Sequence, residues 1–321
     1  MPYINVDEVY ILDNTGLQVD QVVDLPYTDA GLSDTQQAQA RKNIAAGGTN
    51  PNLLDNPFFG SGEVVNQRGV TSGTTTNATY FIDRWLTTYG SAAGTYSLGS
   101  NGITLTPASS TTVTMYQKLA NANAIDGKVV TASVLLSDGT IYSGTITRAN
   151  GSVQNYYYAN GIRIRQVADN GFHIDVSLNG GVTIRAAKLE LGSVSTLAND
   201  VPPDYGTELL KCQRYFVRLK SSNSYCPFGT ALGASTNSAY IFVPLPATLR
   251  ANPTSVSASA IAQFSLYGEG GDYALSSSIS ARGITPNGVT LAGTATGVVT
   301  QGTYSFICKD TTSYIDLSAD L

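Results

Sequence analysis

Between residues 51 and 201, apolar and polar positions alternate with a period of two, which is typical of β-strands with one buried face. Ile162 and Ile164, for example, alternate with Arg163 and Arg165. Such positions point to opposite faces of a sheet, so we expect the isoleucines to face a core and the arginines to face water. The pattern predicts antiparallel sheets.

Turn-forming dipeptides divide this region at intervals of about ten residues. They are Asp138-Gly139, Asn150-Gly151, Asn160-Gly161, Asn170-Gly171 and Asn179-Gly180. Asn-Gly and Asp-Gly favour the type I′ turn, whose twist matches that of the flanking strands. Short strands joined in this way are typical of an antiparallel sandwich or jelly roll, which we predict for residues 51–205.

The alternation changes phase once, in the run from Val182 to Leu191. The apolar positions are even-numbered up to Ala186 and odd-numbered from Leu189 onward. One extra residue in a strand produces such a change, so we predict a β-bulge near Ala187.

A second region of strand-like patterns follows a pair of prolines. It begins with helical spacing in residues 207–216, where Leu209, Cys212 and Phe216 share one face. Strand-like runs then return up to the last residue. We predict a short helix and a smaller, distal β-sandwich within residues 206–321.

Two stretches rich in glycine, serine and asparagine, residues 221–237 and 268–272, separate the strand-like runs of this second region. We predict that both are loops. Tyrosine rings stack on the apolar face of a sugar, and carboxylates accept hydrogen bonds from its hydroxyls. The candidate ligand-binding residues in or directly beside these stretches are therefore Tyr225, Phe228, Tyr267, Glu269, Asp272 and Tyr273.

Residues 1–50 contain two short strand-like runs and one helix signal. Ser33 and Gln36 fit a capping box, and good helix formers follow up to Ile44. The apolar stripe of this helix is too thin to stabilise it alone. Copies of the helix around a threefold axis would stabilise it, so we expect a homotrimer.

The charge of the chain excludes several functions. Charged residues make up 13% of the chain, against ~25% in an average soluble protein, and the formal net charge is -5. Lys and Arg do not cluster, so we expect no nucleic-acid binding. No apolar run approaches the roughly 18 residues that span a membrane, and no basic segment of a signal peptide is present. The three cysteines are expected to be reduced thiols, most of them buried.

Catalytic constellations are scarce. His173, Asp175 and Ser177, the three residue types of a hydrolase triad, alternate with apolar residues on one strand. A straight strand face offers neither the correct nucleophile position nor oxyanion donors, so we interpret this face as solvated and expect no enzyme, cofactor or metal site. The 23 acidic residues are scattered, and the sequence leaves a glycosidase-type carboxylate pair open.

Two aromatic features have competing interpretations. Trp85 could stack on a sugar, although a lone tryptophan in a sandwich belongs more often to the core. In the run Tyr156-Tyr157-Tyr158, strand geometry must expose at least one ring, which suits either edge packing or binding.

Several motifs occur in an order that resembles the tail fibre and receptor-binding proteins of tailed bacteriophages. They are LSDTQQAQARKNI (32–44), NLLDNPFF (52–59), NQRG (66–69), YFIDRW (80–85), AKLELG (187–192), CQRYF (212–216) and IDLSADL (315–321). The resemblance implies a homotrimeric virion protein that is made in the host cytoplasm. Residues 1–50 would attach it to a tail or baseplate protein, and a host surface glycan or protein would be its receptor.

The resemblance carries over no binding residues, and two alternatives remain open. One is a capsule-degrading tail spike, a glycan depolymerase. The other is the carbohydrate-binding module of a secreted bacterial protein, which should carry a signal peptide. Because a fibre meets the cell with the part opposite its anchor, we place the receptor site in residues 206–321.

Overall fold

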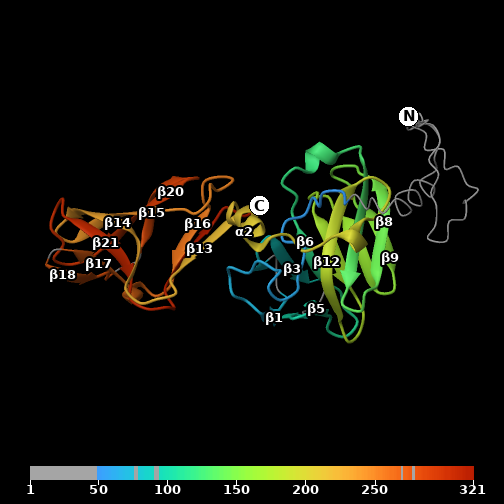
Figure 1. Ribbon diagram of the computed structural model, residues 1–321, viewed down its shortest axis with the longest axis horizontal. Coiled ribbons are helices and arrows are strands. Elements are labelled where there is room, and N and C mark those ends of the chain that lie inside the picture. The colour runs from blue at the N-terminus through green and yellow to red at the C-terminus, as the bar shows by residue number, and fades with distance from the viewer. Residues whose placement is uncertain (1–48, 76–78, 90–93, 269, 277–278) are drawn as a thin grey trace, which may run out of the picture. The chain divides into compact units, whose positions relative to one another are not determined.

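The computed structural model describes residues 49–75, 79–89, 94–268, 270–276 and 279–321 (Figure 1). These residues form mainly antiparallel β-structure, and α2 (Tyr205–Gln213) is the one α-helix among them. The predicted all-β fold with two sandwiches is therefore confirmed. The predicted attachment segment and its helix lie outside the described residues.

Twelve strands form the first sandwich in the described part of the chain. They are β1 (Ser72–Thr74), β2 (Thr79–Ile82), β3 (Trp85–Tyr89), β4 (Thr95–Gly99), β5 (Gly102–Thr106), β6 (Val113–Gln117), β7 (Val129–Leu136), β8 (Ile141–Thr147), β9 (Gln154–Ala159), β10 (Ile162–Gln166), β11 (Phe172–Val176) and β12 (Val182–Leu191). One sheet has the order β1-β4-β5-β12-β7-β8 and the other β2-β3-β6-β11-β10-β9. The early strands β5 and β6 pair with the late strands β12 and β11, as in a jelly roll.

The core of this sandwich is centred on Trp85, which is fully buried. Its ring makes edge-to-face contacts with Phe59 and Phe172, whose centroids lie 5.2 Å and 6.1 Å away. Its Nε1–H donates a hydrogen bond to the carbonyl oxygen of Asn56 at 2.8 Å. The core interpretation of Trp85 is therefore correct, and this ring does not contact a ligand at the surface.

The turn dipeptides mark real chain reversals, but of more than one kind. Asn160 and Gly161 both have left-handed φ angles, 52° and 68°, as the type I′ hairpin between β9 and β10 requires. Asp138-Gly139 and Asn170-Gly171 also lie in hairpins, whereas Asn150-Gly151 and Asn179-Gly180 lie in connections that cross between the sheets. The type I′ prediction is thus correct for one of the five.

The bulge in β12 occurs at Arg185, two residues before its predicted place. The register of β12 against β7 shifts between Ile184 and Ala186. Beyond the shift both faces of β12 are buried, because residues near the 3₁₀ helix η2 (Leu197–Asn199) contact the face opposite the main core. Lys188 and Glu190 lie on that covered face, and both are fully buried.

Among the residues that the structure describes, ten strands form the second sandwich. They are β13 (Phe216–Lys220), β14 (Cys226–Ser235), β15 (Ser238–Pro244), β16 (Ser255–Ala258), β17 (Phe264–Gly268), β18 (Gly271–Ala274), β19 (Ser280–Thr285), β20 (Gly288–Thr294), β21 (Thr303–Cys308) and β22 (Tyr314–Ser318). A three-stranded sheet, β13-β22-β16, packs on a seven-stranded sheet, β18-β17-β21-β14-β15-β20-β19. Both sheets contribute residues to one core.

Two predictions for this region are wrong in detail. Most of the stretch 221–237 is strand β14 rather than a loop. Its glycines are there for close packing: a Cβ at Gly229 would lie 2.1 Å from the carbonyl oxygen of Phe242, and one at Gly233 equally close to that of Val299. The helix begins at Tyr205, where the Asp204 side chain caps it, and ends before Phe216.

Arg68 joins the two sandwiches. Its guanidinium forms ion pairs with Asp83 of the first sandwich at 3.2 Å and with Asp320 near the end of the second at 2.6 Å. The same group lies 3.7 Å from the centroid of the Phe216 ring. The side-chain amide of Gln67 donates to the carbonyl oxygen of Phe216 at 2.8 Å. Charged and aromatic contacts therefore hold the joint.

The joint should make stability depend on pH. Burial raises the pKa of Asp83 to about 6, although Arg68 and hydrogen bonds from Gln67 oppose the shift. A free carboxyl has a pKa of about 3.9, so between these values the folded state binds more protons than the unfolded state. Stability should therefore rise by about 1 kcal/mol as the pH falls from about 7.5 to about 5. Burial also raises the pKa of Asp320, in the same sense.

Urea unfolding at the two pH values tests this, with Asp83→Asn as the comparison. The wild-type chain should gain more stability than the variant on acidification, whatever the variant's stability at neutral pH. Equal gains in both proteins would contradict the assignment to Asp83.

Candidate functional site

The first two predicted ligand-binding residues lie at the beginning of β14. Tyr225 is 66% exposed and has a left-handed φ of 59°, which is uncommon for a bulky residue. Phe228 is half-buried and contacts the rings of Phe264 and Phe306 in the core. A hollow of about 300 Å³ beside Phe228 is also lined by Lys220.

The others lie on the hairpin of β17 and β18. Tyr267 is 58% exposed and pairs directly with Asp272 on the outside of the sheet. Tyr273 instead packs on the core, edge-to-face with Tyr304 at 5.5 Å. Glu269 lies outside the described residues.

The structure does not bring the two groups together. Strand pairing places Tyr267 level with Ser305 and Thr230, which is five residues beyond Tyr225 along β14. At about 3.3 Å per residue the two groups are ~16 Å apart along the strands. The predicted ligand-binding residues therefore form two separate groups. The group that contains Tyr267 and Asp272 belongs to a larger surface.

That surface is the outer face of the seven-stranded sheet, opposite the core. Strand pairing aligns one row of exposed or half-buried side chains across the sheet: Asp272, Tyr267, Ser305, Thr230, Phe242 and Thr290. A second row contains Thr303, Leu232, Tyr240 and Ala292. We call these two rows the outer face.

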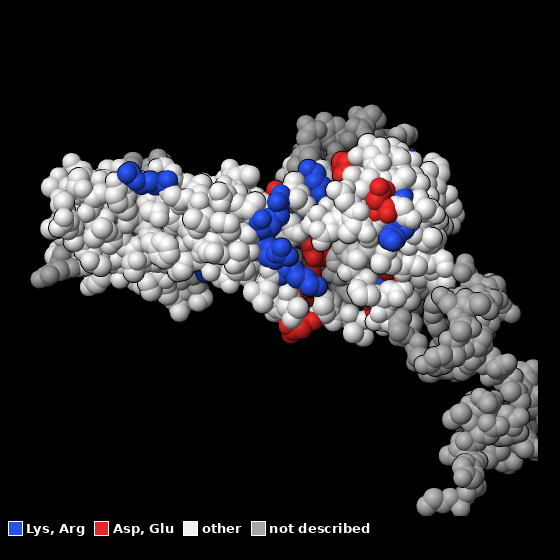
Figure 2. Space-filling view, turned by 90° about the horizontal axis from the view of Figure 1, so that it is seen from above, with Lys and Arg blue, Asp and Glu red and all other residues white. Residues whose placement is uncertain are grey.

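The outer face combines apolar side chains with hydroxyls and has little charge. Phe242 is 51% exposed and Leu232 48% exposed, although both are large and apolar. The guanidinium of Arg282 lies 4.2 Å from the centroid of the Tyr240 ring, and Asp272 pairs with Lys309 at 3.7 Å. Figure 2 shows one side of this sandwich, where charged side chains are sparse. Exposed apolar surface of this kind marks interaction sites.

The outer face could be found only in part from the sequence. The sequence indicates Tyr267 and Asp272, because they lie beside and within a glycine-rich stretch. Phe242 and Leu232 were missed, because the pairing of β14 with β15 and β21 cannot be read from local pattern. The available signal was the alternation of Tyr240 and Phe242 with Ile241 and Val243.

The prediction that His173 and Asp175 lie on a solvated strand face is wrong. The two residues are 6% and 3% exposed. The neighbouring strands cover them, since Tyr116 stacks on the His173 ring at 4.5 Å and Arg165 Nε donates to Asp175 at 2.6 Å. Burial alone would raise the pKa of Asp175, but hydrogen bonds from Arg165 and Thr114 outweigh it and lower the pKa.

Neither a metal cluster nor a membrane helix is found in the described ranges. No group of three or more His, Cys, Asp or Glu side chains there could hold a metal ion. No helix of the described chain is long and apolar enough to cross a membrane. All three cysteines are unpaired, as expected, and two of them are buried.

Comparison with family models, with curated proteins and with solved structures finds no match for this chain.

Proposed function

We propose that this chain is the receptor-binding fibre protein of a bacteriophage tail and that it attaches the virion to glycans of the host surface. The ordered motifs that resemble tail fibres support the class of protein. The outer face supports the location of the receptor site in the second sandwich.

The main support for a receptor site here is the row of side chains from Tyr267 to Phe242 on the outer face. A sugar ring has an apolar face, which packs on aromatic side chains, and an edge of hydroxyls, which need hydrogen-bond partners. The row supplies both, because the hydroxyls of Ser305 and Thr230 lie between the two rings. Asp272 and Arg282 add charged partners at the edges of the sheet.

The assembly follows from the sequence. Three copies would associate, residues 1–50 would attach the trimer to a tail or baseplate protein, and the assembled protein would be part of the virion. No catalytic step is required for this role, so we propose an adhesin rather than an enzyme.

Removing both aromatic rings from the row should abolish most of the adhesion. We expect Phe242→Ala combined with Tyr267→Ala to weaken cell binding by about 10-fold or more, since each aromatic contact contributes about 1 kcal/mol. The measurement uses the labelled full chain and a panel of bacterial strains with different surface glycans, and the variants are compared on the strains that bind it.

The matched control replaces two exposed apolar residues of the first sandwich, Val153→Ala and Tyr158→Ala, which are 66% and 71% exposed. This control should bind like the wild-type chain. Binding by the outer-face variant that equals that of the control would overturn the proposed site.

A further inference from the structure

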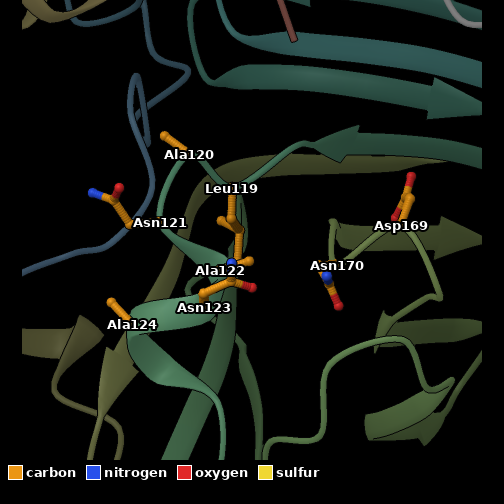
Figure 3. A pocket seen from close by; sticks show the side chains of 8 residues that line it. All are labelled: Leu119, Ala120, Asn121, Ala122, Asn123, Ala124, Asp169 and Asn170. Carbon is orange, nitrogen blue, oxygen red and sulfur yellow. The ribbon is translucent and has the colours of Figure 1, made fainter.

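The first sandwich has a hollow of its own, lined by residues of a different sandwich from the outer face (Figure 3). It measures about 490 Å³, within the roughly 300–1,000 Å³ of small-ligand sites. Two segments face each other across it: residues 119–124, at the start of the 3₁₀ helix η1 (Ala122–Ile125), and Asp169-Asn170 in the β10–β11 hairpin.

Asp169 is held in a fixed position at this hollow while its side chain is 42% exposed. Its Oδ1 accepts a hydrogen bond from the Gly171 amide at 2.8 Å and lies 3.5 Å from His173 Nε2. His173 is itself buried and stacked on Tyr116. The nearby His173 ring and the Gly171 amide lower the pKa of Asp169, so the carboxylate is charged at neutral pH.

The second oxygen of Asp169, Oδ2, is available to a ligand. No described residue donates a hydrogen bond to it, whereas both contacts above use Oδ1. On the other side the exposed Asn123 side chain points toward Asn170, whereas that of Asn121 points away (Figure 3). Asn123 Oδ1 accepts a hydrogen bond from Asn150 Nδ2 at 2.9 Å, which leaves the Asn123 NH₂ group for a ligand. An amide NH₂ group can donate to a hydroxyl, and the small side chains of Ala122 and Ala124 leave room on this side.

The charges around the hollow argue against a metal ion. Arg148 Nη2 donates to the carbonyl oxygen of Asn170 at 2.8 Å, which removes a ligand that a cation would need. Lys118 is close enough for its positive charge to lower the pKa of Asp169. A neutral ligand with several hydroxyls fits these surroundings better.

We infer that this hollow is a second saccharide site, in which Asp169 Oδ2 accepts a hydrogen bond from a sugar hydroxyl and the Asn123 NH₂ group donates one to a neighbouring hydroxyl. The site lies in a different sandwich from the outer face and does not depend on it.

The inference is tested by saturation-transfer NMR of the full chain with a panel of methyl glycosides and their deoxy analogues. At least one glycoside should bind, its deoxy analogue at the contacted hydroxyl should not, and Asp169→Asn should weaken binding by about 10-fold or more, as loss of a charged hydrogen bond does. Asp138→Asn, an exposed carboxylate at a turn of the same sandwich, is the matched control and should bind normally.

Three outcomes would overturn the inference: no glycoside binds, Asp169→Asn binds as well as Asp138→Asn, or binding requires added Ca²⁺. Equal midpoints of thermal unfolding for the two variants show that both are folded. The combined Phe242→Ala and Tyr267→Ala variant should still bind the glycoside, so a failure of this site and a failure of the outer face are distinguishable.

Discussion

Replacing Lys188 with methionine is expected to lower the free energy of unfolding by about 3–5 kcal/mol. Lys188 Nζ donates to Asp200 at 2.6 Å and to the Thr196 hydroxyl at 2.8 Å, and it lies 3.7 Å from Glu190. Lys188 and Glu190 are fully buried. Without the lysine, two carboxylates would share a nearly dry site with no cation, which is far more costly than the loss of one contact. Urea unfolding measures the change.

Lys128→Met is the matched control, because Lys128 is exposed on the same sandwich and its replacement should change stability by less than about 0.5 kcal/mol. Combining Lys188→Met with Asp200→Asn should recover part of the loss, since one of the two unpaired charges is removed. A Lys188→Met protein as stable as the Lys128→Met protein would show that the buried cluster does not need its cation.

Trp85→Ala is expected to cost about 3–5 kcal/mol, as truncation of a large buried aromatic side chain does. The loss combines a cavity between Phe59 and Phe172 with an unpaired carbonyl at Asn56. Trp85→Phe keeps most of the volume and should cost clearly less. Unfolding must be followed by circular dichroism, because the chain has 1 Trp and the variant has none.

The comparison for Trp85 is Tyr158→Ala, which removes a ring that is 71% exposed and should leave stability nearly unchanged. In the wild-type chain, tryptophan fluorescence reports on the first sandwich alone, since Trp85 lies in that core. A Trp85→Ala protein with unchanged stability would contradict the packing described for this core.

Local pattern was sufficient where one residue's neighbours along the chain determine its environment. The alternation of Ile162 and Ile164 with Arg163 and Arg165 gave the correct buried face of β10. Asn160-Gly161 gave the correct hairpin, because left-handed φ angles are a local property of those residues. Tyr158 exposes its ring, in agreement with the expectation that at least one of the three rings is exposed. Tyr156 is buried although it lies two residues away, because the register of β9 against β10 shifts at Tyr156.

Local pattern gave the wrong environment for residues that strands distant in sequence cover. Because His173 alternates with core residues, the pattern predicts that it is exposed to solvent. In the structure, the ring of Tyr116 from β6 stacks on it and buries it. Glycine-rich composition suggested a loop in residues 221–237, whereas Gly229 and Gly233 let other backbones approach β14. Tyr267 and Phe242 lie in one row of the outer face because β21 and β14 pair between their strands. No pattern within β17 or β15 predicts this strand order.

The most direct test of the central claim, that the second sandwich binds the receptor, is an exchange of residues 206–321. These residues are replaced by the corresponding part of a fibre protein with a different host range, and adsorption of the resulting particles is measured on both hosts. The account predicts that host range follows the exchanged residues. Host range that stays with residues 51–205 would contradict it and would place the receptor site in the first sandwich.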